Sequence, residues 1–174
     1  MKKVSRYFIS FLVIILVSMG MFACKGSSTT YITEDDILNI MDEVEVATLN
    51  KDIDGVMKYL APSVVINVYL SSPYGPQKVP MTREEYQKET LKGWSMTTDY
   101  EYRLENEEII KISDDGQTAV VETDVIESYV MEGRTIDTST HERITLQVVD
   151  GEILVTRINA FMRTQSDDHL IPLI

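Results

Sequence analysis

The side chains able to do chemistry in this 174-residue chain are one cysteine, two histidines and 28 carboxylates. A zinc site needs cysteines and histidines at short, regular spacings. Cys24 stands alone and His141 lies far from His169, so neither a metal site nor a cofactor is predicted. The stretch DIDG, residues 52–55, resembles the start of a calcium loop but lacks its third ligand and its closing glutamate. A helix cap is the better interpretation.

Cys24 follows an uncharged segment, residues 8–23, that is preceded by three basic residues. This layout is typical of a secretory signal peptide, with a retained transmembrane anchor as the alternative. The sequence MFAC, residues 21–24, resembles the lipobox of bacterial lipoproteins, in which the cysteine receives diacylglycerol. The resemblance implies a signal peptide over 1–23, a lipidated Cys24 on a polar tether over 24–32, and attachment to a membrane of the bacterial cell envelope. Otherwise Cys24 is an incidental thiol of the leader.

The charge of the exported part limits its partners. Removing the three basic residues of the leader leaves 13 basic residues against 28 acidic ones, a formal charge of −15. Nucleic acid is therefore not expected as a partner, because its phosphates require cationic neutralisation. The remaining length suits one domain, residues 33–165, and a single cysteine excludes an intramolecular disulfide. The tail over 166–174 ends in the apolar LIPLI, which either folds back or docks elsewhere.

Helices are predicted in the first half of the domain. Thr33 and Asp36 form a capping box ahead of an apolar stripe, which predicts a helix over 34–50. Asp52 caps a second helix that Pro62 ends. Residues 63–70 are β-branched and aromatic and predict a strand. The next segment, 71–80, holds three prolines and is expected to be a loop without regular structure.

A third helix is predicted from the capping box of Thr82 and Glu85 to about Met96. Four alternating segments then follow, separated by short turns that contain glycine; they cover residues 99–112, 117–131, 135–149 and 152–164. Helices first and strands after predict an α+β domain, with a curved antiparallel sheet packed on three N-terminal helices.

Alternation along residues 140–149 assigns side chains to the two faces of the sheet. Ile144 and other apolar residues share a face with Glu142, while His141 and Arg143 lie on the opposite face. The apolar face must contact the helices. We therefore expect Glu142 to point inward and His141 to be solvated on the outside, where no carboxylate is placed by spacing to orient it.

The sequence TLNKDIDGVMKYLAPSVVINV, residues 48–68, has a long helix, a short helix opened by Asp and then a strand. With the later helix and four strands, this order resembles the nuclear-transport-factor-2-like superfamily, which includes ketosteroid isomerases and SnoaL-like polyketide cyclases. The resemblance covers roughly residues 33–165. It implies a cone-shaped, cystatin-like α+β fold that encloses a pocket between the concave sheet and the helices.

The isomerases of that superfamily place a tyrosine, an acid–base carboxylate and a second carboxylic acid in the pocket. Matching DIDG to their short helix puts the tyrosine position at Val44 and the carboxylate position at Val68, both apolar here. The second acid falls near Glu142 and Arg143. The resemblance therefore implies no catalytic set, and it nominates as pocket-lining residues Val44, Val68, Trp94, Tyr102 and Glu142.

Three functions remain open from the sequence. The favoured hypothesis is a non-catalytic module on the cell envelope that binds a small apolar ligand or a protein. The alternative is an acid–base isomerase, lyase or cyclase whose only nominees are Glu142, Tyr102 and His141. The third is a homodimer formed through the sheet. Trp94 and Tyr86 are expected to be core residues, with ligand stacking as the alternative, and Tyr100 and Tyr102 are expected to pack.

Overall fold

The computed structural model describes residues 30–71, 75 and 77–165. The predictions for the leader, for Cys24 and for the LIPLI tail therefore lie outside the described residues. No helix among the described residues is both long and apolar enough to cross a bilayer.

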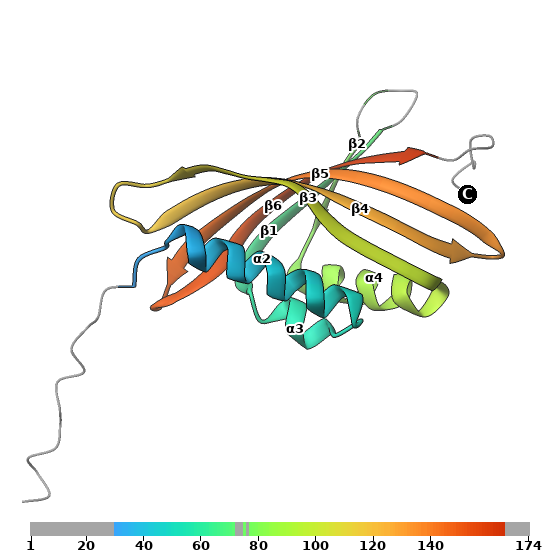
Figure 1. Cartoon of the computed structure of the whole chain (residues 1–174), viewed down its shortest axis with the longest axis horizontal. Coiled ribbons are helices and arrows are strands. Elements are labelled where there is room, and N and C mark those ends of the chain that lie inside the picture. The colour runs from blue at the N-terminus through green and yellow to red at the C-terminus, as the bar shows by residue number, and fades with distance from the viewer. Residues whose placement is uncertain (1–29, 72–74, 76, 166–174) are drawn as a thin grey trace, which may run out of the picture.

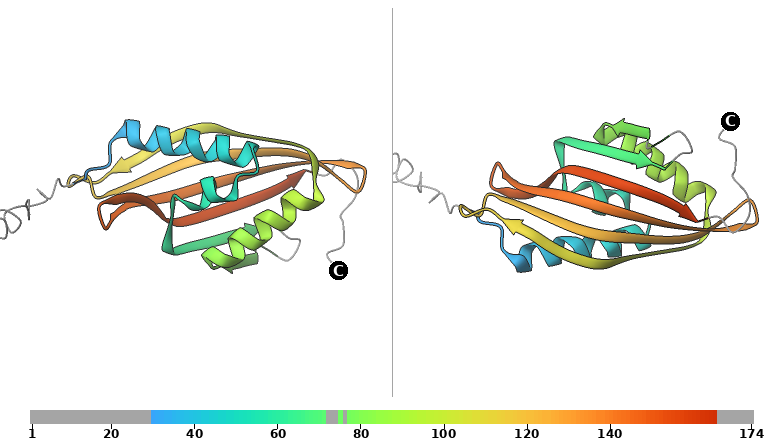
Figure 2. Two further views of the ribbon diagram at one scale, coloured as in Figure 1. Left: turned by 90° about the horizontal axis from the view of Figure 1, so that it is seen from below. Right: turned by 90° about the horizontal axis from the view of Figure 1, so that it is seen from above.

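Three helices cover one face of a single curved sheet (Figure 1). Their bounds are α2 (Glu34–Leu49), α3 (Ile53–Met57) and α4 (Arg83–Met96). α2 lies along β3 (Thr98–Ile112), and α4 lies along β1 (Leu60–Leu70), on the opposite side of the same face (Figure 2).

Both long helices begin where the sequence predicts. Thr33 accepts a hydrogen bond from the backbone N–H of Asp36, and the Asp36 carboxylate accepts one in return from the Thr33 backbone. Thr82 and Glu85 do the same at the start of α4. Asp52 caps α3 by accepting from Gly55 N–H, which confirms the cap interpretation of DIDG. These caps satisfy backbone donors that the first helical turn leaves free.

The sheet has six strands in the order β2-β1-β6-β5-β4-β3. Besides β1 and β3 they are β2 (Gln77–Met81), β4 (Thr118–Met131), β5 (Arg134–Val149) and β6 (Glu152–Gln165). The α+β prediction and the four long strands are confirmed. One detail differs from the predicted antiparallel sheet, because β1 runs parallel to β6. The hairpins are closed by Glu132 with Gly133 and by Asp150 with Gly151, all at positive φ, as two-residue turns of type I′ require.

Two local predictions were wrong. The second helix ends at Met57, not at Pro62, because Leu60 pairs with Val155 of β6 and draws this stretch into β1. The segment 71–80 is not all loop, because residues from Gln77 onward form β2, with Pro80 opposite Asn67. β2 is an edge strand, where proline is tolerated because its missing N–H removes no bond from the ladder.

The sheet bends around the helices, and a bulge in β3 contributes to this bend. The register of β3 with β4 shifts between Glu105 and Glu108, and Asn106 in this bulge has φ of 54°. Asparagine tolerates this left-handed conformation better than most residues, and a bulge increases the local twist. The core between sheet and helices is closed by fully buried Ile37, Ile66 and Leu146. Several residues of this core, Ile66 among them, also line a cavity under the concave face.

Candidate functional site

A cavity of about 520 Å³ lies between the concave face of the sheet and the three helices. Most of its wall is apolar, and all three helices and all six strands contribute to it, with Ile40 of α2, Ile66 of β1 and Leu104 of β3 among the lining residues. Its rim includes the side chain of Met96, which is 52% exposed at the end of α4. The cavity therefore opens where α4 ends and β3 begins.

The structure places all five of the nominated pocket residues on this wall, namely Val44, Val68, Trp94, Tyr102 and Glu142. Tyr86 of α4 lines it as well. Trp94 is buried with Ala47 and Val56 and also faces the cavity, so it serves both as a core residue and as a wall. His141 is not a lining residue, since it is exposed on the outer face of β5, as the alternation predicted.

Polar groups gather at one end of the cavity, on the strands next to its opening. Tyr102 of β3, Glu127 of β4 and Thr138 of β5 lie side by side in the sheet. The Tyr100 hydroxyl donates a hydrogen bond of 2.6 Å to one Glu127 oxygen, and the Thr138 hydroxyl donates one of 3.4 Å to the other. Glu127 therefore has both oxygens occupied.

Glu127 was missed by the sequence reasoning, although a signal was present. In β4, it alternates in step with Val121, Thr123 and Val125, all of which face the helices. Parity along this strand would have placed Glu127 inward by the same argument that placed Glu142 inward.

Glu142 differs from Glu127 in having no partner. Its neighbours across the sheet are Thr123 on β4 and Ala160 on β6, and the Thr123 hydroxyl donates instead to the Glu105 carbonyl at 3.1 Å. Among the described residues, no group forms a hydrogen bond with the Glu142 carboxylate. No side-chain oxygen of the described residues is both fully buried and unpaired, so the Glu142 oxygens reach the open space of the cavity. Burial, and then the negative charge of Glu127, raise the pKa of Glu142 to about 7, against a smaller lowering by His141.

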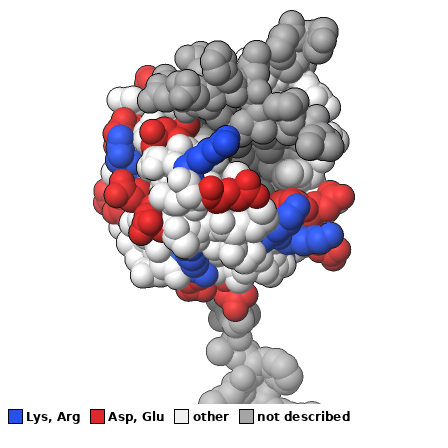
Figure 3. Space-filling model, turned by 90° about the vertical axis from the view of Figure 1, so that its right-hand side faces the viewer, with Lys and Arg blue, Asp and Glu red and all other residues white. Residues whose placement is uncertain are grey.

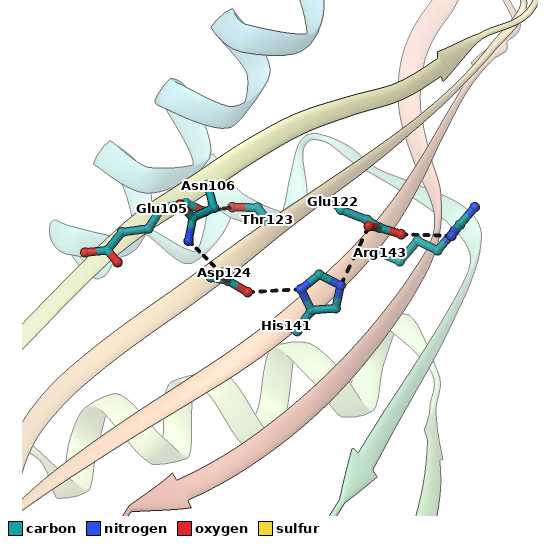
Figure 4. A network of polar contacts seen from close by, with 7 residues as sticks. All are labelled: Glu105, Asn106, Glu122, Thr123, Asp124, His141 and Arg143. Atoms are coloured by element: carbon teal, nitrogen blue, oxygen red, sulfur yellow. Dashed lines mark hydrogen bonds and ion pairs between the residues drawn. The ribbon is translucent and has the colours of Figure 1, made fainter.

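A network on the outer face flanks Glu142 and holds its strand in register (Figure 4). His141 Nδ1 lies 3.0 Å from Asp124, whose other carboxylate oxygen accepts from Asn106 in the β3 bulge at 2.8 Å. Arg143 donates to Glu122 at 2.8 Å. The carboxylate beside His141 thus comes from β4, which spacing along the chain could not reveal. Because residues flanking Glu142 are tied outward, the side chain of Glu142 points inward.

The phenols around the cavity keep their protons at neutral pH. Burial raises the pKa of Tyr86, Tyr100 and Tyr102. The negative charge of Glu127 raises it further in all three, and that of Glu142 does so in Tyr86 and Tyr102. A neutral phenol can donate a hydrogen bond as well as accept one. The polar end therefore offers hydroxyl donors, carboxylate acceptors and aromatic rings within an otherwise apolar wall.

Basic side chains are missing from the wall. None of the described residues that line the cavity is Lys, Arg or His. Cations do lie next to it: the Lys51 ammonium is 5.6 Å from the Tyr100 ring centroid and donates to the carbonyls of Trp94 and Thr97. The Lys58 ammonium is 4.6 Å from the Tyr59 ring centroid, and Arg83 donates to the Leu60 carbonyl. Within the described part of the chain, no three His, Cys, Asp or Glu residues are grouped so as to hold a metal ion.

Comparisons with known proteins show the fold. No protein-family model matches the sequence, and no curated protein matches it. Among solved structures, a nuclear-transport-factor-2-like protein from Cytophaga hutchinsonii has 17% identity and a TM-score of 0.57, over 75% of this chain and 98% of that one. A similar protein from Rhodospirillum rubrum, described as of unknown function in nutrient uptake, has 14% identity and a TM-score of 0.58, over 74% and 99%.

An enzyme shares the fold too. A hexachlorocyclohexane dehydrochlorinase from Novosphingobium barchaimii has 12% identity and a TM-score of 0.56, over 79% of this chain and 92% of that one. The chain therefore has the nuclear-transport-factor-2-like fold, which enzymes and proteins of unknown function share. At these identities the fold does not assign an activity.

Proposed function

We propose that this chain is a lipoprotein of the bacterial cell envelope whose domain binds a small, largely apolar ligand without transforming it. The observation that carries the proposal is the cavity of about 520 Å³ between sheet and helices. Small-molecule sites commonly have roughly 300–1,000 Å³, apolar walls and a few convergent polar groups. The cavity has all three features.

Binding without catalysis is favoured by the chemistry of the wall. Val44 and Val68 line the cavity and cannot transfer protons. Glu127 is tied to Tyr100 and Thr138 through both of its oxygens, and Glu142 has no described hydrogen-bond partner with which to relay a proton. The wall therefore lacks the positioned tyrosine and carboxylate of the isomerases and leaves Glu142 as the one carboxylate free to exchange a proton with a ligand.

The position of the tether suits a module that stands away from a membrane. Residues 30–32 form hydrogen bonds with turns at one end of the sheet. The Thr30 hydroxyl donates to the Gly151 carbonyl, and the Ile32 N–H donates to the Gly116 carbonyl. Tyr129, at the polar end of the cavity, lies near the opposite end of β4. A strand of this length spans roughly 45 Å at about 3.3 Å per residue. A lipid on Cys24 would thus hold the domain with its opening directed outward.

Ligand binding can be tested with the only tryptophan of the chain, Trp94, because it lines the cavity. The full-length chain in a neutral detergent is titrated with 4-phenylbutanol while Trp94 fluorescence is recorded. A saturable change is expected, and Val44→Phe should weaken binding by narrowing the cavity. Leu38→Phe, at an exposed position of the same helix, is the matched control and should bind normally. A change that persists unaltered in Val44→Phe would contradict binding in the cavity.

The membrane anchor has its own test. Replacing Cys24 with Ser should release the protein from the membrane fraction, since lipidation needs the thiol and stable anchoring needs the acyl chains. Equal membrane retention of Cys24→Ser and wild type would refute lipidation at this residue.

An acid–base enzyme is the second candidate, and one observation favours it. Glu142 has a pKa of about 7 and faces the cavity with Tyr102, so it can both hold and release a proton near neutral pH. Turnover of model ketosteroids or polyketide-like substrates, lost in Glu142→Gln, would establish this activity and refute a purely binding role.

A further inference from the structure

We infer that the cavity selects an organic cation: a small ligand whose apolar body fills the wall and whose protonated amine contacts Glu142. This inference rests on the proposed ligand-binding function and names the chemical class of the ligand.

The first argument is the sign of the charges on the wall. The ionisable residues that line the cavity are three glutamates and five tyrosines, namely Glu89, Glu127, Glu142, Tyr59, Tyr86, Tyr100, Tyr102 and Tyr129. The cations next to the wall are already bound elsewhere. Lys51 donates to two carbonyls, Lys58 pairs with Glu43, and Arg83 donates to the carbonyls of Met57 and Leu60. A buried anionic ligand would meet like charges without a counter-ion. A cation would meet opposite ones.

The protein as a whole is acidic, since residues 24–174 carry 13 basic side chains against 28 acidic ones. The end of the molecule drawn in Figure 3 shows acidic and basic side chains interspersed among uncharged ones. The carboxylates of the cavity differ from these because they act in an enclosed site, where the low dielectric strengthens each interaction.

The second argument is the unsatisfied carboxylate. Glu142 is partly buried, lines the cavity and has no hydrogen-bond partner among the described residues, whereas Glu127, also on the wall, has a partner at each oxygen. A buried carboxylate is stabilised by charged donors, and an ammonium group supplies three. A neutral alcohol could donate to Glu142 as well, but it would leave the charge of Glu127 uncompensated.

The third argument is the aromatic lining next to both carboxylates. Tyr86, Tyr102, Tyr129 and Trp94 come from three different elements and all face the cavity. The faces of such rings attract organic cations within about 6 Å, by roughly 0.5–2 kcal/mol each. Aromatic rings and carboxylates in one apolar site form the combination that binds an amine on a hydrocarbon body.

Ionisable groups reach Glu142 from several sides. Glu127 approaches from β4, Tyr102 from β3 and Tyr86 from α4, while His141 lies on the outer face of β5. Of these, only His141 can become cationic, and the sheet separates it from the cavity. A bound ammonium group would therefore be the positive charge closest to Glu142 and would favour its ionised form.

The test uses three probes that share one body and differ in their heads: 4-phenylbutylamine, 4-phenylbutanol and 4-phenylbutyrate. Each is titrated at pH 8 into the full-length chain while Trp94 fluorescence is recorded. We expect the amine to bind at least tenfold more tightly than the alcohol and the carboxylate to bind most weakly. Glu142→Gln should weaken amine binding at least tenfold. Glu101→Gln, which removes the same charge from an exposed position of β3, should leave the amine affinity unchanged.

The outcomes separate the inference from the function beneath it. If the alcohol or the carboxylate binds as tightly as the amine, the cavity binds ligands but the inferred class is wrong. If none of the three changes Trp94 fluorescence, both the inference and the proposed function fail. If Glu101→Gln weakens the amine as much as Glu142→Gln does, general surface charge is responsible and the assignment to Glu142 is refuted.

Discussion

Replacing Glu142 with Gln should make the domain more stable at alkaline pH while leaving its stability near pH 4.5 unchanged. The folded state raises the pKa of this carboxyl from 4.5 to about 7. Below pH 4.5 this carboxyl is protonated in both the folded and the unfolded state, so it does not change the free energy of unfolding. Between these pH values the folded state retains a proton that the unfolded state has released, so the free energy of unfolding falls as pH rises. Above pH 7 the carboxyl is ionised in both states, and the free energy of unfolding falls no further.

The size of the effect follows from the two pKa values. Each tenfold change in proton affinity corresponds to about 1.4 kcal/mol, so the rise from 4.5 to about 7 amounts to roughly 3 kcal/mol. Partial contact with water in the cavity makes this an upper value. The Gln side chain has the shape of the protonated acid and carries no charge at any pH. At pH 8 the variant should therefore exceed wild type by about 2–3 kcal/mol, or roughly 10 °C in Tm.

Urea titrations followed by Trp94 fluorescence at pH 5, 6, 7 and 8 would measure the difference. If Glu142 is a desolvated carboxylate, this difference should grow with pH, because a general gain in packing would be the same at every pH. Glu101→Gln serves as the control, since its side chain is exposed on the opposite face of β3. A constant difference between Glu142→Gln and wild type from pH 5 to 8 would refute the account of Glu142 as a desolvated carboxylate.

Three further predictions concern packing, polar pairing and ligand binding. Gly55→Ala should destabilise by roughly 1–3 kcal/mol in urea, because its Cβ would lie 2.7 Å from the Asp52 carboxylate that caps α3. Asn67→Ala should lower the free energy of unfolding by roughly 1–3 kcal/mol, because the Asn67 amide donates a hydrogen bond of 2.9 Å to Asn159. Introducing Asn159→Ala into the Asn67→Ala variant should lower it by less than Asn159→Ala does in the wild type. Amine affinity, measured by Trp94 fluorescence, should rise up to about tenfold from pH 6 to 8 as Glu142 ionises.

Local rules predicted the elements of this fold well. The capping boxes at Thr33 and Thr82 mark helix starts because the side chains that satisfy the first turn lie within four residues. Hairpin turns such as Asp150 with Gly151 are equally local. Alternation placed Glu142 inward and His141 outward because a strand has two faces and only one can contact the helices.

Features that depend on pairing between distant segments escaped prediction. Leu60 has helical spacing with the residues before it, yet β6, more than 90 positions later, pairs with it and extends β1. The same strand makes β1 its parallel neighbour, which no local pattern indicates. Asp124 meets His141 only because β4 and β5 adopt one particular register. The site could be predicted only in part. Alternation along each strand shows which residues point inward, but it does not show that residues from different strands meet at one end of the cavity.

The polar end of the cavity is best understood as a place where local stability is given up. A sequence optimised for folding alone would put an apolar or fully bonded side chain where Glu142 stands, because a desolvated carboxylate without a partner opposes folding. Glu127 shows that the fold can satisfy a carboxylate on this face, since Tyr100 and Thr138 bond both of its oxygens. Glu142 lacks such support only where its carboxylate meets the open space. A cationic ligand supplies the missing donors there. Glu142 therefore destabilises the domain without a ligand and stabilises the domain with a cationic ligand bound.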